Sequence, residues 1–157
     1  MDKVEVELVI PTDANTVYSV AKDIEKFPEF MPDVERVTVT ERSGGRVVSE
    51  WVGIVREFKR RITWVEEDRW DDAALRCDFA AVGGDWDTYR GTWTFEPAGE
   101  CTRVRLALEF ELNVPLLGPL IKGLLVRLVR KNCQQMLEGL RDRLSGGFGS
   151  SANPNHP

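Results

Sequence analysis

Residues 116–144 read LLGPLIKGLLVRLVRKNCQQMLEGLRDRL, and this segment decides the fold. Its apolar residues recur at spacings of three and four, which places them on one stripe of an α-helix. They are Leu117, Leu120, Ile121, Leu124, Leu128, Met136, Leu137 and Leu140. A helix this long needs a large apolar surface to lie on, and a curved antiparallel sheet supplies one. A cavity left between such a sheet and helix is where a functional site is expected.

The chain before this helix predicts a series of β-strands. Residues 3–10 alternate between apolar and charged side chains, as a strand with one buried face does. Further strands are expected at residues 34–41, 46–55, 58–66, 74–82, 87–96 and 102–112. The stretches between them are short and rich in glycine or charge, so the neighbouring strands should be antiparallel.

Two short helices are expected between the first and second strands. Thr12 or Asp13 can cap the first of them, which carries apolar residues at i, i+3, i+4 and i+7. The second runs from Asp23 through Phe27 and stops at Pro28. The order of elements predicts an α+β fold, in which a curved antiparallel sheet of about seven strands wraps around the long C-terminal helix.

Composition limits the possible functions. The 157 residues favour one domain, which we place at residues 1–144, followed by a disordered tail at residues 145–157 that is rich in Ser, Gly, Asn and Pro. The net charge of −5 argues against nucleic-acid binding. The charged N-terminus is no signal peptide, and no apolar run reaches the ~20 residues of a membrane span.

Histidine and cysteine usage exclude several chemistries. The single histidine, His156, lies in the tail, so neither a Ser-His-Asp or Cys-His arrangement nor a histidine-based zinc site can form. Cys77, Cys101 and Cys133 have unrelated spacings and include no CxxC pair, which favours reduced thiols in a cytoplasmic protein. We expect neither a metal nor a cofactor.

Three stretches carry a resemblance to a known family: IEKFPEFMP at residues 24–32, YRGTWTFEP at 89–97 and PLLGPLIK at 115–122. In these stretches and in its order of elements, the chain resembles the START-like, or Bet v 1-like, helix-grip superfamily (SRPBCC). It looks most like the polyketide cyclase/dehydrase and coenzyme Q-binding (Coq10-type) branch, over about residues 4–144. The resemblance implies the fold, whereas the superfamily's functions range from lipid carriers and quinone binders to aromatase/cyclases and toxin-like ribosome-binding proteins.

Arg60 is the first candidate site residue. Residues 58–64 read FKRRITW, and the even positions Phe58, Arg60, Ile62 and Trp64 should face inward. A cation on that apolar face needs a carboxylate or an anionic or carbonyl-bearing ligand. Two alternatives remain open: Arg60 could lie at the cavity mouth or in a structural ion pair.

The strand before it has two possible registers. A two-residue turn at Arg56 and Glu57 places Trp51 on the inner face, whereas a three-residue loop brings Glu50 inside, near Arg60. A one-residue slip exchanges the two faces of the strand. Glu50 is therefore a conditional partner of Arg60, and its alternative position is outward and solvated.

Aromatic side chains mark the later strand. Tyr89, Trp93 and Phe95 share one face, which should turn toward the helix. Most such aromatics are core residues, but a buried tyrosine hydroxyl needs a partner, and that of Tyr89 could bind a ligand carbonyl or quinone oxygen. The catalytic candidates are Arg60, Tyr89 and Glu50. The candidate ligand-binding residues are Phe27, Phe30, Met31, Trp51, Arg60, Ile62, Trp64, Tyr89, Trp93, Leu124 and Leu128.

Two other features are ambiguous. The acidic residues Glu66, Glu67, Asp68, Asp71 and Asp72 resemble a metal cluster, but we interpret them as solvated charges around a hairpin turn. The C-terminal helix carries six basic residues against two acidic ones, so it could touch an anionic membrane, although a solvated face is the simpler interpretation.

Three functions remain. The first is binding of a hydrophobic small molecule, such as a quinone, polyketide or lipid, between the sheet and the C-terminal helix. The second is a polyketide aromatase/cyclase-dehydratase, in which Arg60 would polarise a carbonyl and Tyr89 would donate or orient a proton. The third is a toxin-like ribosome-interacting protein. A monomer or a homodimer suits each of them.

Overall fold

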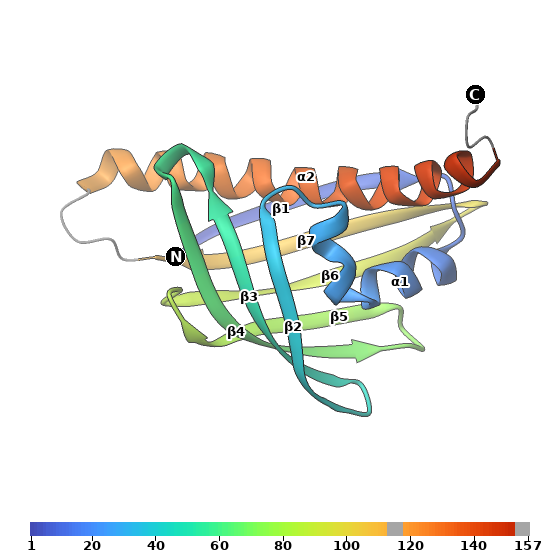
Figure 1. The fold of residues 1–157 in the computed structure, drawn as a ribbon, viewed down its shortest axis with the longest axis horizontal. Helices are drawn as coiled ribbons and strands as arrows, with labels where there is room; N and C mark the ends of the chain where they lie inside the picture. Colours follow the sequence, from blue (N-terminus) through green and yellow to red (C-terminus); the bar gives the residue numbers. More distant parts are fainter. Residues whose placement is uncertain (113–117, 153–157) are drawn as a thin grey trace.

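A curved seven-stranded antiparallel sheet packs against one long helix in the computed structural model, which describes residues 1–112 and 118–152 (Figure 1). The strands follow the order β1-β7-β6-β5-β4-β3-β2 across the sheet. They are β1 (Asp2–Ile10), β2 (Val34–Ser43), β3 (Arg46–Val55), β4 (Arg60–Asp71), β5 (Arg76–Gly84), β6 (Thr88–Ala98) and β7 (Cys101–Glu111). Helix α2 (Gly118–Ala152) lies along one face of the sheet, so the predicted helix-grip arrangement is confirmed.

Two short helices connect β1 to β2, as predicted: α1 (Ala14–Lys22) and the 3-10 helix η1 (Ile24–Glu29). The carboxylate of Asp13 caps α1 by accepting a hydrogen bond from the backbone N–H of Thr16 at 3.1 Å. The residues that α1 buries are Ala14, Val17, Tyr18 and Ala21, the set that its spacing indicates. A third short helix, η2 (Arg56–Phe58), lies between β3 and β4.

Strand β4 is longer than the sequence suggested. Its predicted end was residue 66, because the acidic residues that follow were assigned to a solvated turn. The strand instead continues to Asp71, and its side chains alternate between buried and more exposed positions along most of this length. Glu66 and Asp68 therefore point inward, so the interpretation of these two residues as solvated charges is wrong.

The buried stripe of α2 differs from the predicted one in its first half. The buried residues are Leu125, Val129, Cys133, Met136, Leu137, Leu140 and Leu144. Leu124 and Leu128, which we placed on the stripe, are only half-buried. Residues 124–126 and 128–129 are all apolar, so spacing alone could not fix the rotation of this part of the helix. The predicted side chains of Leu117, Leu120 and Ile121 lie outside those described.

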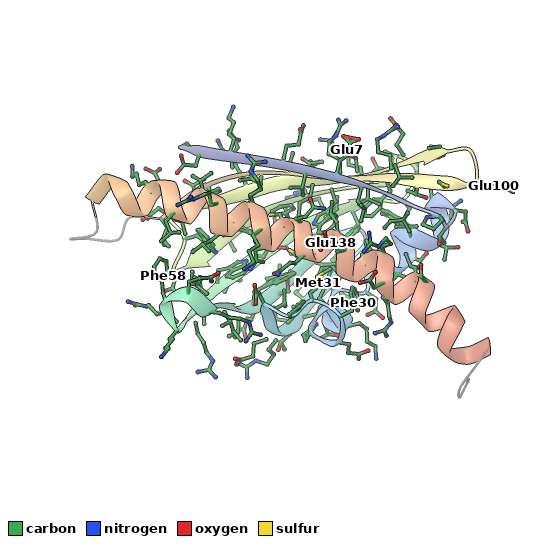
Figure 2. The ribbon with its side chains drawn as sticks, turned by 90° about the horizontal axis from the view of Figure 1, so that it is seen from above. Glu7, Phe30, Met31, Phe58, Glu100 and Glu138 are labelled. Atoms are coloured by element: carbon green, nitrogen blue, oxygen red, sulfur yellow. The ribbon has the colours of Figure 1, made fainter. Side chains whose placement is uncertain are left out.

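Helix α2 is held close to the loop that follows η1. At Gly139 an added Cβ would lie 2.1 Å from the carbonyl oxygen of Phe30, so only glycine permits this approach. Figure 2 shows Phe30 and Met31 beside α2, with Glu138 on the helix above them. The helix continues to Ala152, beyond the start of the predicted tail, and residues 153–157 with His156 lie outside the described part. No described helix is both long and apolar enough to span a membrane.

Candidate functional site

A pocket opens between the inner face of the sheet and α2. Its cavity volume is about 80 Å³, and the wider unfilled space of about 790 Å³ around it includes open solvent. Its sheet side is formed by Val34, Trp51, Gly53, Ile54, Val55, Ile62, Trp64, Trp86, Tyr89 and Leu108. Its helix side is formed by Leu125, Leu128, Val129, Asn132, Cys133 and Met136. Side chains therefore leave the predicted cavity between sheet and helix partly open.

Stacked aromatic rings form the wall of this pocket. Trp51 on β3 pairs with Trp64 on β4, and their rings stack with centroids 5.6 Å apart. Tyr89 lies against Trp64 at 5.2 Å and against Trp86 at 4.9 Å. The backbone of Gly84 sits directly behind Trp64, where an added Cβ would be 2.4 Å from the Trp64 Cα atom. The ring of Trp64 thus contacts the rings of Trp51, Tyr89 and Trp86, and the β5 backbone lies close to its Cα atom.

The wall carries two hydrogen-bond donors that have no acceptor among the described residues. Within the described residues, the Tyr89 hydroxyl makes no hydrogen bond, and the buried Nε1 atom of Trp86 has no partner. Burial raises the pKa of Tyr89 well above its usual value, and the neighbouring Cys133 adds to the effect. The hydroxyl is therefore a neutral donor near neutral pH. These groups favour a ligand that presents an acceptor oxygen.

Charged side chains are confined to the mouth of the pocket. Lys131 of α2 and Glu57 of η2 approach to 3.5 Å across the opening. Asn132 donates to Asp33 at 3.0 Å, and Asp33 also accepts from Arg56 at 2.8 Å. Each carboxylate that lines the pocket is thus already engaged by a cation or an amide, so neither serves as a free base.

A second polar group lies behind the wall. Glu66 and Asp68 on β4 are 5% and 2% exposed, and the indole N–H of Trp64 donates to Glu66 at 3.0 Å. Burial raises the pKa of Glu66, and the adjacent Asp68 raises it further; burial likewise raises the pKa of Asp68. The same-face positions 64, 66, 68 and 70 read Trp, Glu, Asp, Trp, and the two flanking tryptophans were the signal that could have revealed this inward pair. Among the described residues, no cluster of histidine, cysteine or carboxylate side chains could hold a metal.

The structure brings five of the predicted ligand-binding residues together: Trp51, Ile62, Trp64, Tyr89 and Leu128 line one pocket. The others lie elsewhere. Phe27, Met31 and Trp93 are core residues with at most 7% exposure, and Leu124 is half-buried beside the pocket. Phe30 packs on Phe27 and under the guanidinium group of Arg143.

Arg60 and Glu50 do not face the pocket. The loop between β3 and β4 contains four residues, so Val55 pairs with Arg60 at the open end of the hairpin, where Arg60 is exposed. Figure 2 shows Phe58 at this end of the hairpin. Glu50 pairs with Val65 on the outer face and is also exposed. The expectation that Arg60 lies inside, and the register that would bring Glu50 beside it, are therefore wrong.

Sequence reasoning missed several lining residues. Trp86 was assigned to no strand, and the incorrect rotation of α2 concealed Leu125, Val129 and Cys133.

Residues 10–137 match the family model described as polyketide cyclase/dehydrase and lipid transport. The chain belongs to this family. The predicted superfamily is thereby confirmed. Members of this family bind hydrophobic ligands or cyclise polyketides, so one of these two functions is indicated. Coenzyme Q binding, the narrower expectation, is not specifically indicated.

Three known proteins are similar to this member of the polyketide cyclase/dehydrase and lipid transport family in shape or in sequence. TTHA0849 from Thermus thermophilus is 38% identical, with a TM-score of 0.89 over 93% of this chain and 99% of its own. The Zhui aromatase/cyclase from Streptomyces sp. R1128 is 19% identical, with a TM-score of 0.82 over 91% and 95%. The ribosome association toxin RatA of Rickettsia prowazekii (strain Madrid E) is 21% identical over 72% of this chain and 78% of its own, a distant relationship.

Proposed function

We propose that the protein binds one hydrophobic small molecule, with at least one acceptor oxygen, in the pocket between the sheet and α2. Polyketides, quinones and lipids with a carbonyl or ether oxygen belong to this class. The observation that supports the proposal is an aromatic and aliphatic lining that includes Tyr89 and Trp86, whose polar hydrogens have no acceptor among the described residues, with charge only at the mouth. Such a lining stabilises an apolar body through burial and orients it through few polar contacts.

Native mass spectrometry of the freshly purified protein, followed by solvent extraction, tests this proposal. A stoichiometric apolar molecule in the wild type is the expected result. Leu128→Trp should exclude it, because Leu128 lines the pocket and the larger ring would fill the space. Leu124→Trp is the matched control, because Leu124 lies one turn earlier on α2 and does not line the pocket. Equal ligand content in both variants would contradict the pocket as the site.

A second candidate is an aromatase/cyclase-dehydratase. Its support is Tyr89, a pocket-lining residue whose neutral hydroxyl has no acceptor among the described residues and could donate to a ligand carbonyl. An aldol closure also needs a base. Asp33 and Glu57 are the carboxylates that line the pocket, and both are engaged at the mouth. Binding is therefore the simpler role. Cyclisation of a poly-β-ketone by the wild type, with loss of the reaction in Tyr89→Phe, would instead establish the enzyme.

The remaining expectations concern partners and location. Lys122, Arg127, Arg130 and Lys131 are exposed on α2, which supports weak contact with an anionic membrane during ligand exchange. Sedimentation with vesicles containing phosphatidylserine, at low and high salt, tests that contact.

A cytoplasmic location and a monomeric or homodimeric state stay predictions. A ribosomal role has only the distant RatA relationship in its favour, and the chain's net charge of −5 opposes it.

A further inference from the structure

Glu66 and Asp68 form a buried acid pair on the inner face of β4, behind the wall of the pocket. They are two residues apart on one strand, so their side chains project to the same side. Neither carboxyl makes an ion pair with any described lysine or arginine, and one oxygen of Asp68 has no hydrogen-bond partner. Two ionised carboxylates without a cation are strongly unfavourable in such a place.

The groups that face the pair from the other elements are neutral near pH 7. Ser49 lies opposite Glu66 on β3, and its hydroxyl accepts from the Trp51 indole at 2.9 Å. The titratable neighbours of the pair are Cys77 on β5 and Tyr89 on β6, and Cys133 on α2 lies next to Tyr89. Burial raises the pKa of all three, that of Cys133 to about 12. These neighbours stay neutral near pH 7, so any change of charge behind the wall near that pH belongs to the acid pair.

Trp64 connects the pair to the pocket. Its ring forms part of the wall, while its indole N–H is bonded to Glu66 at 3.0 Å on the side away from bulk solvent. The β5 strand opposite this point carries an extra residue, because Val65 pairs with Gly83 and Glu66 pairs with Ala81. Such a bulge changes the direction of nearby side chains. The indole is thus fixed by one hydrogen bond in a locally irregular part of the sheet.

We propose that Glu66 and Asp68 share a proton at neutral pH and thereby hold Trp64 in the pocket wall, and that full ionisation of the pair loosens this wall and releases the ligand. Glu66 is a positioning residue in this arrangement, since it acts through Trp64. The release step rests on the proposed function, whereas the fixing of Trp64 does not. The physical cause is mutual repulsion of two desolvated carboxylates, which draws water in behind the ring.

The test compares three variants of the full chain from about pH 5 to about pH 10. Glu66→Gln keeps an acceptor for the indole but removes the ionisable group, whereas Glu66→Met removes both. Glu67→Gln is the matched control, because Glu67 is the next residue, lies on the outer face and pairs with Arg46 at 2.6 Å. The readouts are the indole N–H signal of Trp64 in 1H-15N spectra and the affinity for 1-aminoanthracene, an uncharged probe over this range.

In the wild type and in Glu67→Gln, the Trp64 signal should show one transition as the pH rises, and probe affinity should fall at least about fivefold across it. In Glu66→Gln the transition should disappear or move to lower pH, and affinity should persist. In Glu66→Met the signal should be displaced at every pH while circular dichroism shows a folded chain. A Trp64 signal independent of pH in the wild type, or an unchanged transition in Glu66→Gln, overturns the proposal. A normal Trp64 transition with no probe binding at any pH overturns instead the proposed function and the release step.

Discussion

Trp51 and Trp64 face each other across β3 and β4, with their ring planes only 11° from parallel. Both indole N–H groups are bonded away from the pocket, to Ser49 and Glu66 respectively. The stacked pair therefore presents ring surface to the pocket while its polar atoms are satisfied behind it. This arrangement explains how one region of the sheet can be both an apolar binding wall and the site of buried carboxyls.

Tyr89→Phe should weaken binding of ligands that carry an acceptor oxygen and leave other ligands unaffected. The Tyr89 hydroxyl has no acceptor among the described residues, so its loss removes a ligand hydrogen bond and no internal one. We expect affinity for 1-tetralone to fall about 3- to 10-fold, and affinity for tetralin, which lacks the oxygen, to stay unchanged. Isothermal titration calorimetry measures both. An equal loss for the two ligands would show that the hydroxyl acts only through packing.

Glu66→Gln should stabilise the fold at neutral pH. The pKa of Glu66 is raised in the folded state, so the free energy of unfolding is highest below its ordinary value of 4.5 and falls as pH rises through the folded-state pKa. Removal of the ionisable group should add about 1–3 kcal/mol at a pH near 8 and almost nothing near pH 4. Urea unfolding at the two pH values measures this difference.

The neighbouring residue provides a control of opposite sign. Arg46 lowers the pKa of Glu67, so Glu67→Gln should lose stability at neutral pH and approach the wild type in acid. If Glu66→Gln behaved like Glu67→Gln, Glu66 would be ionised in the folded protein, contrary to its position in the structure.

The ion pair at the mouth should control exchange rates more than stability. Lys131 and Glu57 are both substantially exposed, so Lys131→Ala should change the free energy of unfolding by less than about 1 kcal/mol. Release of 1-aminoanthracene in stopped-flow experiments should become about two- to fivefold faster, because the link between α2 and η2 is lost. Arg141→Ala, on the same helix but beside Asp142, should leave the rate unchanged. Identical rates in all three proteins would exclude a role for the pair.

Arg60→Ala should leave ligand affinity within about twofold of the wild type, since Arg60 is exposed and does not line the pocket. Ile62→Ala, two residues along the same strand, should lower the affinity about tenfold because Ile62 does line it. Titration of each variant with 1-tetralone compares them. A large loss of affinity in Arg60→Ala alone would show that Arg60 takes part in ligand binding.

The alternation of apolar and polar residues predicted the inner face of β3 and β4 correctly in the middle of the two strands. It failed at the ends of β4. Trp51, Ile62 and Trp64 were placed correctly, because a two-residue and a four-residue loop give the same parity. Arg60 occupies an even position as well, which should face inward. It lies at the end of the hairpin that reaches solvent, however, and alternation does not indicate where a strand leaves the core. The acid pair was missed because charged residues beside a turn are usually solvated, and only the flanking tryptophans argued otherwise.

The C-terminal helix shows a different limit. Its existence followed from the spacing of its apolar residues, and its second half was placed correctly at Met136, Leu137 and Leu140. In the first half, apolar residues surround too much of the helix for spacing to indicate one face. Contacts with the sheet decide the rotation there and bring Leu125 and Val129 to the pocket.

The most direct test of a ligand pocket between the sheet and α2 is a titration with 1-aminoanthracene followed by the five tryptophan indole signals in 1H-15N spectra. The signals of Trp51, Trp64 and Trp86, which line the pocket, should shift with one saturable transition. Those of Trp70 and Trp93, which are buried in the core, should stay in place. Shifts confined to Trp70 and Trp93, or no saturable shift at all, would contradict the pocket as a binding site.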